Sequence, residues 1–441
     1  MNPTLASSCR ARVEDRLMRI ETENDANSIF ISVAADHARA EADAADARHA
    51  AGQQKGTLDG VIVGVKDNLA VAGLPRTGGT GLKPAPESSD AACVAKLRAA
   101  GAVILGTLNM HEGALGATTD NPFHGRCSNP LGEGLTPGGS SGGSGAAVAA
   151  QLVDLALGTD TMGSVRIPAA YCGTFGLKPT DGLIGRDGLM LLCEQLDTIG
   201  VLTADPGLLL PALETLAGQG NDPFAVIPPS DWPQRSAGAL KVLVPEEIAQ
   251  VDCDAAQMDA LQRVETALTK CGVIIEHAPL SGWHPGQDRR GGLLLVEAEG
   301  ARLLADILAD PAQRECLSAD FRGLLDYGAH SSALKLSGAL SRLRSTRAAV
   351  ERAFANYDLI LTPTAPQQAF RFETGAPANQ ADFTSLANFA GVPALSLPVA
   401  LPGEPLPGAA QLLARPWAEK QLCSLAQLLA PLAHPEPAER T

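Results

Sequence analysis

The residues most able to do chemistry lie in a stretch rich in glycine and serine, Leu135 to Ala150. It reads LTPGGSSGGSGAAVAA and places three serines among five glycines before the chain turns apolar. Such a cluster is a flexible linker, a phosphate-binding loop or a loop that holds a reactive hydroxyl. A linker normally joins independent segments, whereas this cluster runs into an apolar, helix-like tract, and no lysine follows the glycines as a P-loop requires. We therefore expect a loop whose glycines let the backbone approach a reaction centre closely.

One part of the loop, Gly139 to Gly143, also satisfies the pattern G-x-S-x-G, which is the nucleophile elbow of α/β-hydrolases. That motif requires a strand immediately before its serine, and the preceding LGEGLTP does not predict one. The match is therefore interpreted as accidental.

A reactive serine needs a base that removes its proton. His111 and His124 are the histidines nearest in sequence, and both are expected to be structural or surface residues. Lys66 is the other option, because it ends the apolar segment IVGV and burial there would depress its pKa enough to leave it neutral. A lysine after a strand is ordinarily a solvated loop residue, so its position alone leaves the base open.

A third segment favours Lys66 as the base over a solvated loop residue. It reads LGTDTMGSVRIPAAYCGTFGLKPTDG, from Leu157 to Gly182. Together with GVKDN (64–68) and PGGSSGGSGAAVA (137–149), it resembles the motifs of the amidase signature family, in that family's order. The first loop serine and the later serine are 24 positions apart (164 minus 140), as the family pattern requires. The resemblance covers most of the chain.

This resemblance implies a catalytic triad in which Lys66 is the base, Ser140 a bridging serine and Ser164 the nucleophile. It also implies that a cis peptide bond holds Ser140 between the other two, where it relays the proton from Ser164 to Lys66. Ser164 would then attack an amide carbonyl, and water would later release the acid from the acyl-enzyme.

The resemblance further implies residues around the triad. The expected oxyanion donors are the backbone N–H groups of Thr161, Met162, Gly163 and Ser164. The expected supporting residues are Ser141, Asp160 and Arg166, and the alternative for the last two is a surface ion pair. Met162 departs from the family, which usually has glycine there, and His111 stands where an acid is common. A methionine would narrow the acyl pocket or disfavour a positive φ, unless it is only core filler.

The pattern around these motifs predicts the elements that position them. Residues Arg10 to His49 are expected to form a helix, and Val61 to Val65 and Ala102 to Leu105 to form buried strands. Ala146 to Gly158 is helical in pattern. Alternation of this kind predicts an α/β layer structure.

The resemblance implies the architecture more closely: one amidase-signature domain over residues 1–441, with a central mixed β-sheet flanked by helices on both faces. Within it we expect N-terminal helices in 1–55, the catalytic signature core in 56–205 and a more variable, substrate-lining part in 206–441.

Composition narrows the classes of function. The net charge of −15 disfavours nucleic acid as a partner. Nine cysteines without a C-x-x-C pair favour reduced thiols in a cytoplasm over a disulfide framework or a zinc site. No apolar run approaches the ~18 residues of a membrane span. Neither a metal nor another cofactor is implied.

The main hypothesis is a stand-alone amidohydrolase that cleaves a small carboxamide or carbamoyl compound to acid and ammonia, with a homodimer as the expected assembly. One alternative is a relative of the A-type component of glutamyl-tRNA(Gln) amidotransferase, which works in a complex. The net charge and Met162 count against it. The other is a catalytically inactive scaffold relative, against which the retention of Lys66, Ser140 and Ser164 counts. The sequence does not identify the amide.

Overall fold

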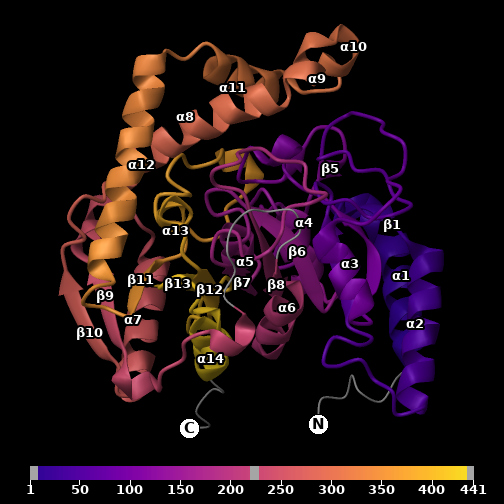
Figure 1. Ribbon diagram of the computed structural model, residues 1–441, viewed down its shortest axis with the longest axis horizontal. Helices are drawn as coiled ribbons and strands as arrows, with labels where there is room; N and C mark the ends of the chain where they lie inside the picture. The colour runs from indigo at the N-terminus through magenta and orange to yellow at the C-terminus, as the bar shows by residue number, and fades with distance from the viewer. Residues whose placement is uncertain (1–7, 219–227, 435–441) are drawn as a thin grey trace.

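The computed structural model describes residues 8–218 and 228–434, and within them one mixed sheet of eleven strands forms the centre of the molecule (Figure 1). Its strands in chain order are β1 (Phe30–Val33), β2 (Ile62–Lys66), β3 (Val103–Leu108), β6 (Leu155–Asp160), β7 (Phe175–Lys178), β8 (Thr198–Thr203), β9 (Lys241–Pro245), β10 (Ile274–Ala278), β11 (Leu359–Pro363), β12 (Ala394–Val399) and β13 (Gly408–Ala414). Two short strands, β4 (Asp120–Asn121) and β5 (Gly125–Arg126), pair separately.

The strand order in the sheet is β1-β3-β2-β6-β8-β7-β12-β13-β11-β9-β10. Pairing is parallel within β3-β2-β6 and within β11-β9-β10, and antiparallel at the other contacts. The expected central mixed sheet is therefore confirmed.

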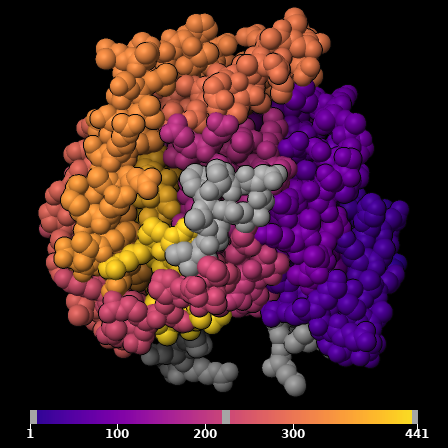
Figure 2. Space-filling view, in the orientation of Figure 1, coloured from indigo at the N-terminus to yellow at the C-terminus, as the bar shows by residue number. Residues whose placement is uncertain are grey.

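Helices cover both faces of this sheet (Figure 1). The helices are α1 (Cys9–Asn27), α2 (Ala35–Ala50), α3 (Ala92–Ala99), α4 (Gly142–Ala149), α5 (Arg166–Tyr171), α6 (Leu209–Leu216), α7 (Ala255–Lys270), α8 (Pro285–Leu303), α9 (Ala305–Ala309), α10 (Pro311–Arg314), α11 (Ala319–Ala329), α12 (Ala333–Ala353), α13 (Ser385–Ala390) and α14 (Glu419–Leu429). Figure 2 shows the orange residues of α8 to α12 at the top of the molecule and along its left side, and the indigo N-terminal part along its right side. None of the helices in the described residues is both long and apolar enough to span a membrane.

The side chains of the central strands alternate between two cores. In β2, Ile62 packs with α1, α2 and α4, whereas Val63 and Val65 pack on the opposite face with α3 and α6. In β6, Ala156 lies in the first core, and Leu155 and Leu157 lie in the second. Because both faces are buried, these strands read as continuous apolar runs, and side chains at their ends emerge inside the protein.

The helix predicted over residues 10–49 is interrupted by a strand. It is two helices, α1 and α2, separated by the edge strand β1, which pairs antiparallel with β3. Ser28 ends α1 in the left-handed region with φ of 49°, and the Asn24 side chain bonds both backbone groups of Phe30. The prediction failed because the apolar residues of the short strand β1 recur at nearly helical spacing.

The predicted helix over residues 146–158 is wrong in its second half. Helix α4 begins earlier, at Gly142, and ends at Ala149, after which Gln151 adopts a positive φ of 57°. The Asp154 carboxylate then accepts the Ile62 N–H at 2.9 Å, and Leu155 begins strand β6. A fully buried strand and a helix share the same apolar composition, which explains the error.

Candidate active site

Lys66 is the last residue of β2 and is fully buried. Its Nζ donates to Ser140 Oγ at 2.8 Å and to Thr159 Oγ1 at 2.7 Å. Burial lowers the pKa of this amine to about 7, although the carboxylates of Asp197 and Asp160 act in the opposite direction. At neutral pH a large share of the lysine is therefore the free amine, which is able to accept a proton.

The glycine-rich loop brings Ser140 to this amine. The Gly139–Ser140 peptide bond is cis, and the Ser140 carbonyl accepts the His111 N–H at 2.9 Å. A Cβ added at Gly143 would lie 2.3 Å from the Asn109 carbonyl oxygen, and one at Gly139 would lie 2.8 Å from the backbone nitrogen of Thr118. These positions accept only glycine, because a neighbouring backbone segment occupies the space of a side chain.

Ser141 connects the loop to the strand that follows it. Its hydroxyl donates to the Thr159 carbonyl at 3.1 Å, and its own N–H donates to the Ser164 carbonyl at 3.2 Å. The expected supporting role of Ser141 thus corresponds to contacts with the strand β6 and with the segment that carries Ser164.

Asp160 and Arg166 form a fully buried ion pair, not a surface pair. Arg166 Nε and Nη2 donate to the two Asp160 oxygens at 3.0 and 2.9 Å, and the same carboxylate accepts the N–H groups of Gly163 and Val165 at 2.7 and 3.1 Å. Although burial opposes ionisation, the Arg166 guanidinium holds the pKa of Asp160 at about 2. One carboxylate thereby fixes the turn between β6 and α5.

A segment distant in sequence completes this turn. Arg166 Nη1 donates to the Thr384 carbonyl and to Gln411 Oε1, and the Asn388 amide donates to the Asp160 carbonyl at 2.9 Å. The Thr384 hydroxyl donates to the Met162 carbonyl at 2.7 Å. Helix α13 and its N-terminal flank therefore hold the 160–166 turn from outside the signature motifs.

The backbone of this turn holds the proposed oxyanion donors. Gly163 has φ of +129° and no room for a Cβ, and its N–H already donates to Asp160. The N–H groups of Thr161, Met162 and Ser164 make no hydrogen bond within the described residues. The geometry thus leaves those three donors, and not Gly163, for a developing oxyanion.

Met162 does not have a positive φ, so its side chain imposes no backbone conflict of that kind. The side chain lies partly buried against an apolar cluster and lines the same cavity as Ser164. It acts as core filler and also narrows that cavity. His111, half-buried, accepts the Thr119 N–H on Nδ1 at 3.1 Å, and its buried surroundings lower its pKa to about 4.

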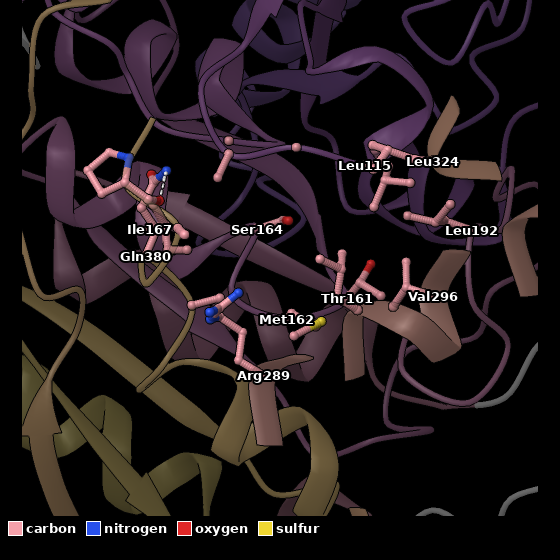
Figure 3. A pocket seen from close by; sticks show the side chains of 18 residues that line it. Leu115, Thr161, Met162, Ser164, Ile167, Leu192, Arg289, Val296, Leu324 and Gln380 are labelled. Carbon is pink, nitrogen blue, oxygen red and sulfur yellow. Dashed lines mark hydrogen bonds between the residues drawn. The ribbon is translucent and has the colours of Figure 1, made fainter. Parts of the chain in front are cut away.

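The cavity beside Ser164 has a volume of about 260 Å³ (Figure 3). Ser164 is half-buried on its wall, and its hydroxyl makes no hydrogen bond within the described residues. The Lys66–Ser140 contact of the expected relay is in place, whereas the Ser140–Ser164 contact is not formed. Catalytic hydrogen bonds of this kind often tighten only when substrate binds.

Sequence reasoning missed several residues of the site. Thr159 and Asp197 lie behind the triad: Thr159 accepts from Lys66, and Asp197 accepts the Thr161 hydroxyl at 2.6 Å. Thr384 and Asn388 reach the turn from 222 and 228 residues away. Thr159 could have been predicted because it lies within the GTDT motif, but nothing in the local sequence marks Asp197, Thr384 or Asn388. The described residues hold no group of three or more His, Cys, Asp or Glu side chains able to bind a metal ion.

Known proteins share this arrangement of sequence and fold. The model of a family described as Amidase matches residues 11–423. The chain is 36% identical over 470 residues to the A-type component of the glutamyl-tRNA(Gln) amidotransferase of Anaeromyxobacter dehalogenans (strain 2CP-C), covering 98% of this chain and 94% of that protein.

Two solved structures share the fold. One, from a study of a vestigial protein complex and the origins of an s-triazine catabolic enzyme, has a TM-score of 0.88 at 29% identity, covering 97% of this chain and 96% of its own. The other is the A-type component of the glutamyl-tRNA(Gln) amidotransferase of Thermotoga maritima, with a TM-score of 0.78 at 27% identity, covering 96% of this chain and 91% of its own.

The buried ion pair predicts a large stability effect. Asp160→Asn is expected to lower the free energy of unfolding by about 3–5 kcal/mol, because it leaves the Arg166 charge buried without its counter-ion. Glu351→Gln breaks the exposed pair Arg347–Glu351 and is the matched control, expected to change stability by less than about 1 kcal/mol. Urea unfolding monitored by circular dichroism measures both. Equal midpoints for wild type and Asp160→Asn would contradict the prediction.

Proposed function

This chain belongs to the Amidase family, and we propose that it hydrolyses the C–N bond of a small carboxamide or carbamoyl compound to acid and ammonia. The observation that carries the proposal is the buried Lys66 amine, hydrogen-bonded to Ser140 and adjacent to the turn that bears Ser164. A buried amine with a pKa of about 7, whose hydrogen-bond partners are hydroxyl groups, is suited to act as a base.

In the proposed mechanism, Ser164 attacks the amide carbonyl while its proton passes through Ser140 to Lys66. The N–H groups of Thr161, Met162 and Ser164 stabilise the oxyanion, and Lys66 returns the proton through Ser140 to the leaving nitrogen. Ammonia departs and an ester on Ser164 remains. Water then attacks that ester while its proton passes through Ser140 to Lys66. Lys66 returns the proton through Ser140 to the Ser164 oxygen, and the acid is released.

The size of the cavity supports a small substrate. Its volume of about 260 Å³ lies below the ~300–1,000 Å³ of typical pockets for drug-sized ligands. Leucine, valine, alanine and methionine side chains make up most of the wall. The acyl part of the substrate is therefore expected to be short.

A second candidate is the A-type component of an amidotransferase, and the 36% identity to such a protein over nearly the whole chain favours it. The two candidates share release of ammonia at Ser164 and differ in the fate of the ammonia. Steady release from a simple amide by the protein alone supports the hydrolase. A requirement for partner proteins and for transfer RNA charged with glutamate supports the amidotransferase.

We also propose a cytoplasmic location and a homodimer. All nine cysteines are free thiols, and burial raises the pKa of several of them, which suits a reducing compartment. Light scattering of the purified chain measures the oligomeric state directly.

The purified protein is expected to release ammonia from at least one class of short aliphatic, aryl, amino-acid or carbamoyl amides. Ser164→Ala is expected to lower kcat/KM by about 10³-fold or more, because the nucleophile is removed. Ser144→Ala is the matched control: Ser144 is another serine of the glycine-rich stretch, in helix α4, but its hydroxyl donates to the Leu157 carbonyl, away from Lys66. Absence of turnover together with absence of Ser164 labelling by a fluorophosphonate would instead indicate an inactive relative.

Activity is also expected to depend on pH through Lys66. Below a pH of about 7 the amine is protonated and cannot accept a proton, so kcat/KM should fall about tenfold per pH unit and should level off above. Lys66→Ala should remove this limb along with about 10²–10⁴ of the rate. The profile is measured by ammonia release between pH 5.5 and about 10. A rate that is still rising at the upper end of this range, towards the ordinary lysine pKa of 10.5, would refute the assignment.

A further inference from the structure

The cavity that holds Ser164 has one charged residue on its wall, Arg289 of helix α8. The other polar side chains there are Thr161, Ser164 and Gln380. Gln380 is already engaged, because its Oε1 accepts from the Tyr171 hydroxyl and its Nε2 donates to the Pro377 carbonyl. Arg289 is therefore the side chain most able to recognise a charged group on the substrate.

Arg289 is held in place through one edge of its guanidinium. Its Nε donates to Asp382 Oδ1 at 2.6 Å, and the two side chains are only 14% and 7% exposed. Nη1 and Nη2 make no hydrogen bond within the described residues. Figure 3 shows Arg289 beside Met162 and below Ser164. The fixed Nε leaves two parallel donors, the geometry that binds a carboxylate in a bidentate manner.

The local charge balance also favours an anion. Asp382 does not line the cavity, and two arginines, Arg289 and Arg290, act on that single carboxylate. Of these three groups only Arg289 lines the cavity, so the charge at the wall itself is positive. None of the residues that line the cavity is an aspartate or glutamate, so a substrate ammonium group finds no counter-ion there.

We propose that the substrate carries a carboxylate in addition to the scissile amide, and that Arg289 binds this carboxylate. This proposal rests on the proposed amidase function and narrows its substrate to short monoamides of dicarboxylic acids and similarly acidic carbamoyl compounds. An α-amino acid amide such as glutamine, which adds an ammonium group, fits this wall poorly.

The test is equilibrium binding to the Ser164→Ala protein, which separates recognition from turnover. Succinamate and malonamate are compared with succinamide and malonamide, which have the same shape but no charge. The monoamides are expected to bind about 10- to 100-fold more tightly than the matching diamides, the range of one charge-assisted hydrogen-bond pair. Isothermal titration calorimetry gives the constants.

Variants of helix α8 test whether Arg289 causes the difference in affinity between monoamides and diamides. Arg289→Met, added to Ser164→Ala, should reduce monoamide affinity to that of the diamide, and Arg289→Lys should retain part of the preference. A further variant, Arg289→Met with Asp382→Asn, removes the buried carboxylate that the single change leaves unpaired. Arg290→Met is the matched control: it removes an exposed charge near Asp382 but outside the cavity wall, and should alter affinity less than about twofold.

The outcomes separate the two proposals. Equal or undetectable binding of monoamides and diamides, or loss of both in Arg289→Met by the same factor, overturns the carboxylate site. If wild type still releases ammonia from the diamides, the amidase function stands without it. If monoamides bind through Arg289 but wild type releases ammonia neither from these four compounds nor from the wider amide panel, the carboxylate site stands and the amidase function fails. Tighter binding of glutamine than of succinamate would also overturn the proposal.

Discussion

The neutral amine of Lys66 is the constraint on which the site depends. A lysine at the end of a strand buried on both faces loses its hydration, and this loss brings its pKa to about 7. Any carboxylate in direct contact would restore the charge and remove the base. The two nearby carboxylates are kept occupied elsewhere: Asp160 by Arg166, and Asp197 by the Thr161 hydroxyl and two backbone N–H groups. In the part of the chain that the structure describes, the hydrogen-bond partners of the amine are the hydroxyl groups of Ser140 and Thr159.

The same carboxylates that are kept from Lys66 shape the neighbouring turn. Asp160 binds the N–H groups of Gly163 and Val165 and thereby orients the peptide units between them. Its pairing with Arg166 extends to Thr384 and Asn388, so the C-terminal half of the chain holds the turn that carries Ser164. One buried ion pair thus keeps the Asp160 carboxylate from bonding to Lys66 and also orients the backbone of the 160–166 turn.

Features that depend on neighbouring residues could be predicted from the sequence, whereas contacts between distant residues could not. The strand before Lys66 and the glycine-rich loop depend on neighbouring residues, and both lie where they were expected. The roles around Ser164 came from a resemblance over whole motifs. The errors arose where composition is ambiguous: β1 was hidden in a helical pattern, and β6 looked like a continuation of α4. Arg289, Thr384 and Asn388 were missed because they meet the site only through folding, across more than a hundred residues of chain.

The positions of these residues indicate how relatives that share one catalytic core can act on different substrates. In the proposed mechanism, Lys66, Ser140 and the backbone donors contact only the carbonyl and the leaving nitrogen, so they would act on any primary amide. Discrimination must come from the rest of the wall, which is built by residues 114–117, by α8, by Leu324 and by residues 377–381. Sequence identity in the catalytic core therefore indicates the type of reaction more than it indicates the substrate. An amino acid donor with charges of both signs requires counter-ions of both signs, and the cavity offers only the positive one. Under the proposed carboxylate site, the choice of substrate thus depends on side chains outside the signature motifs, with Arg289 first among them.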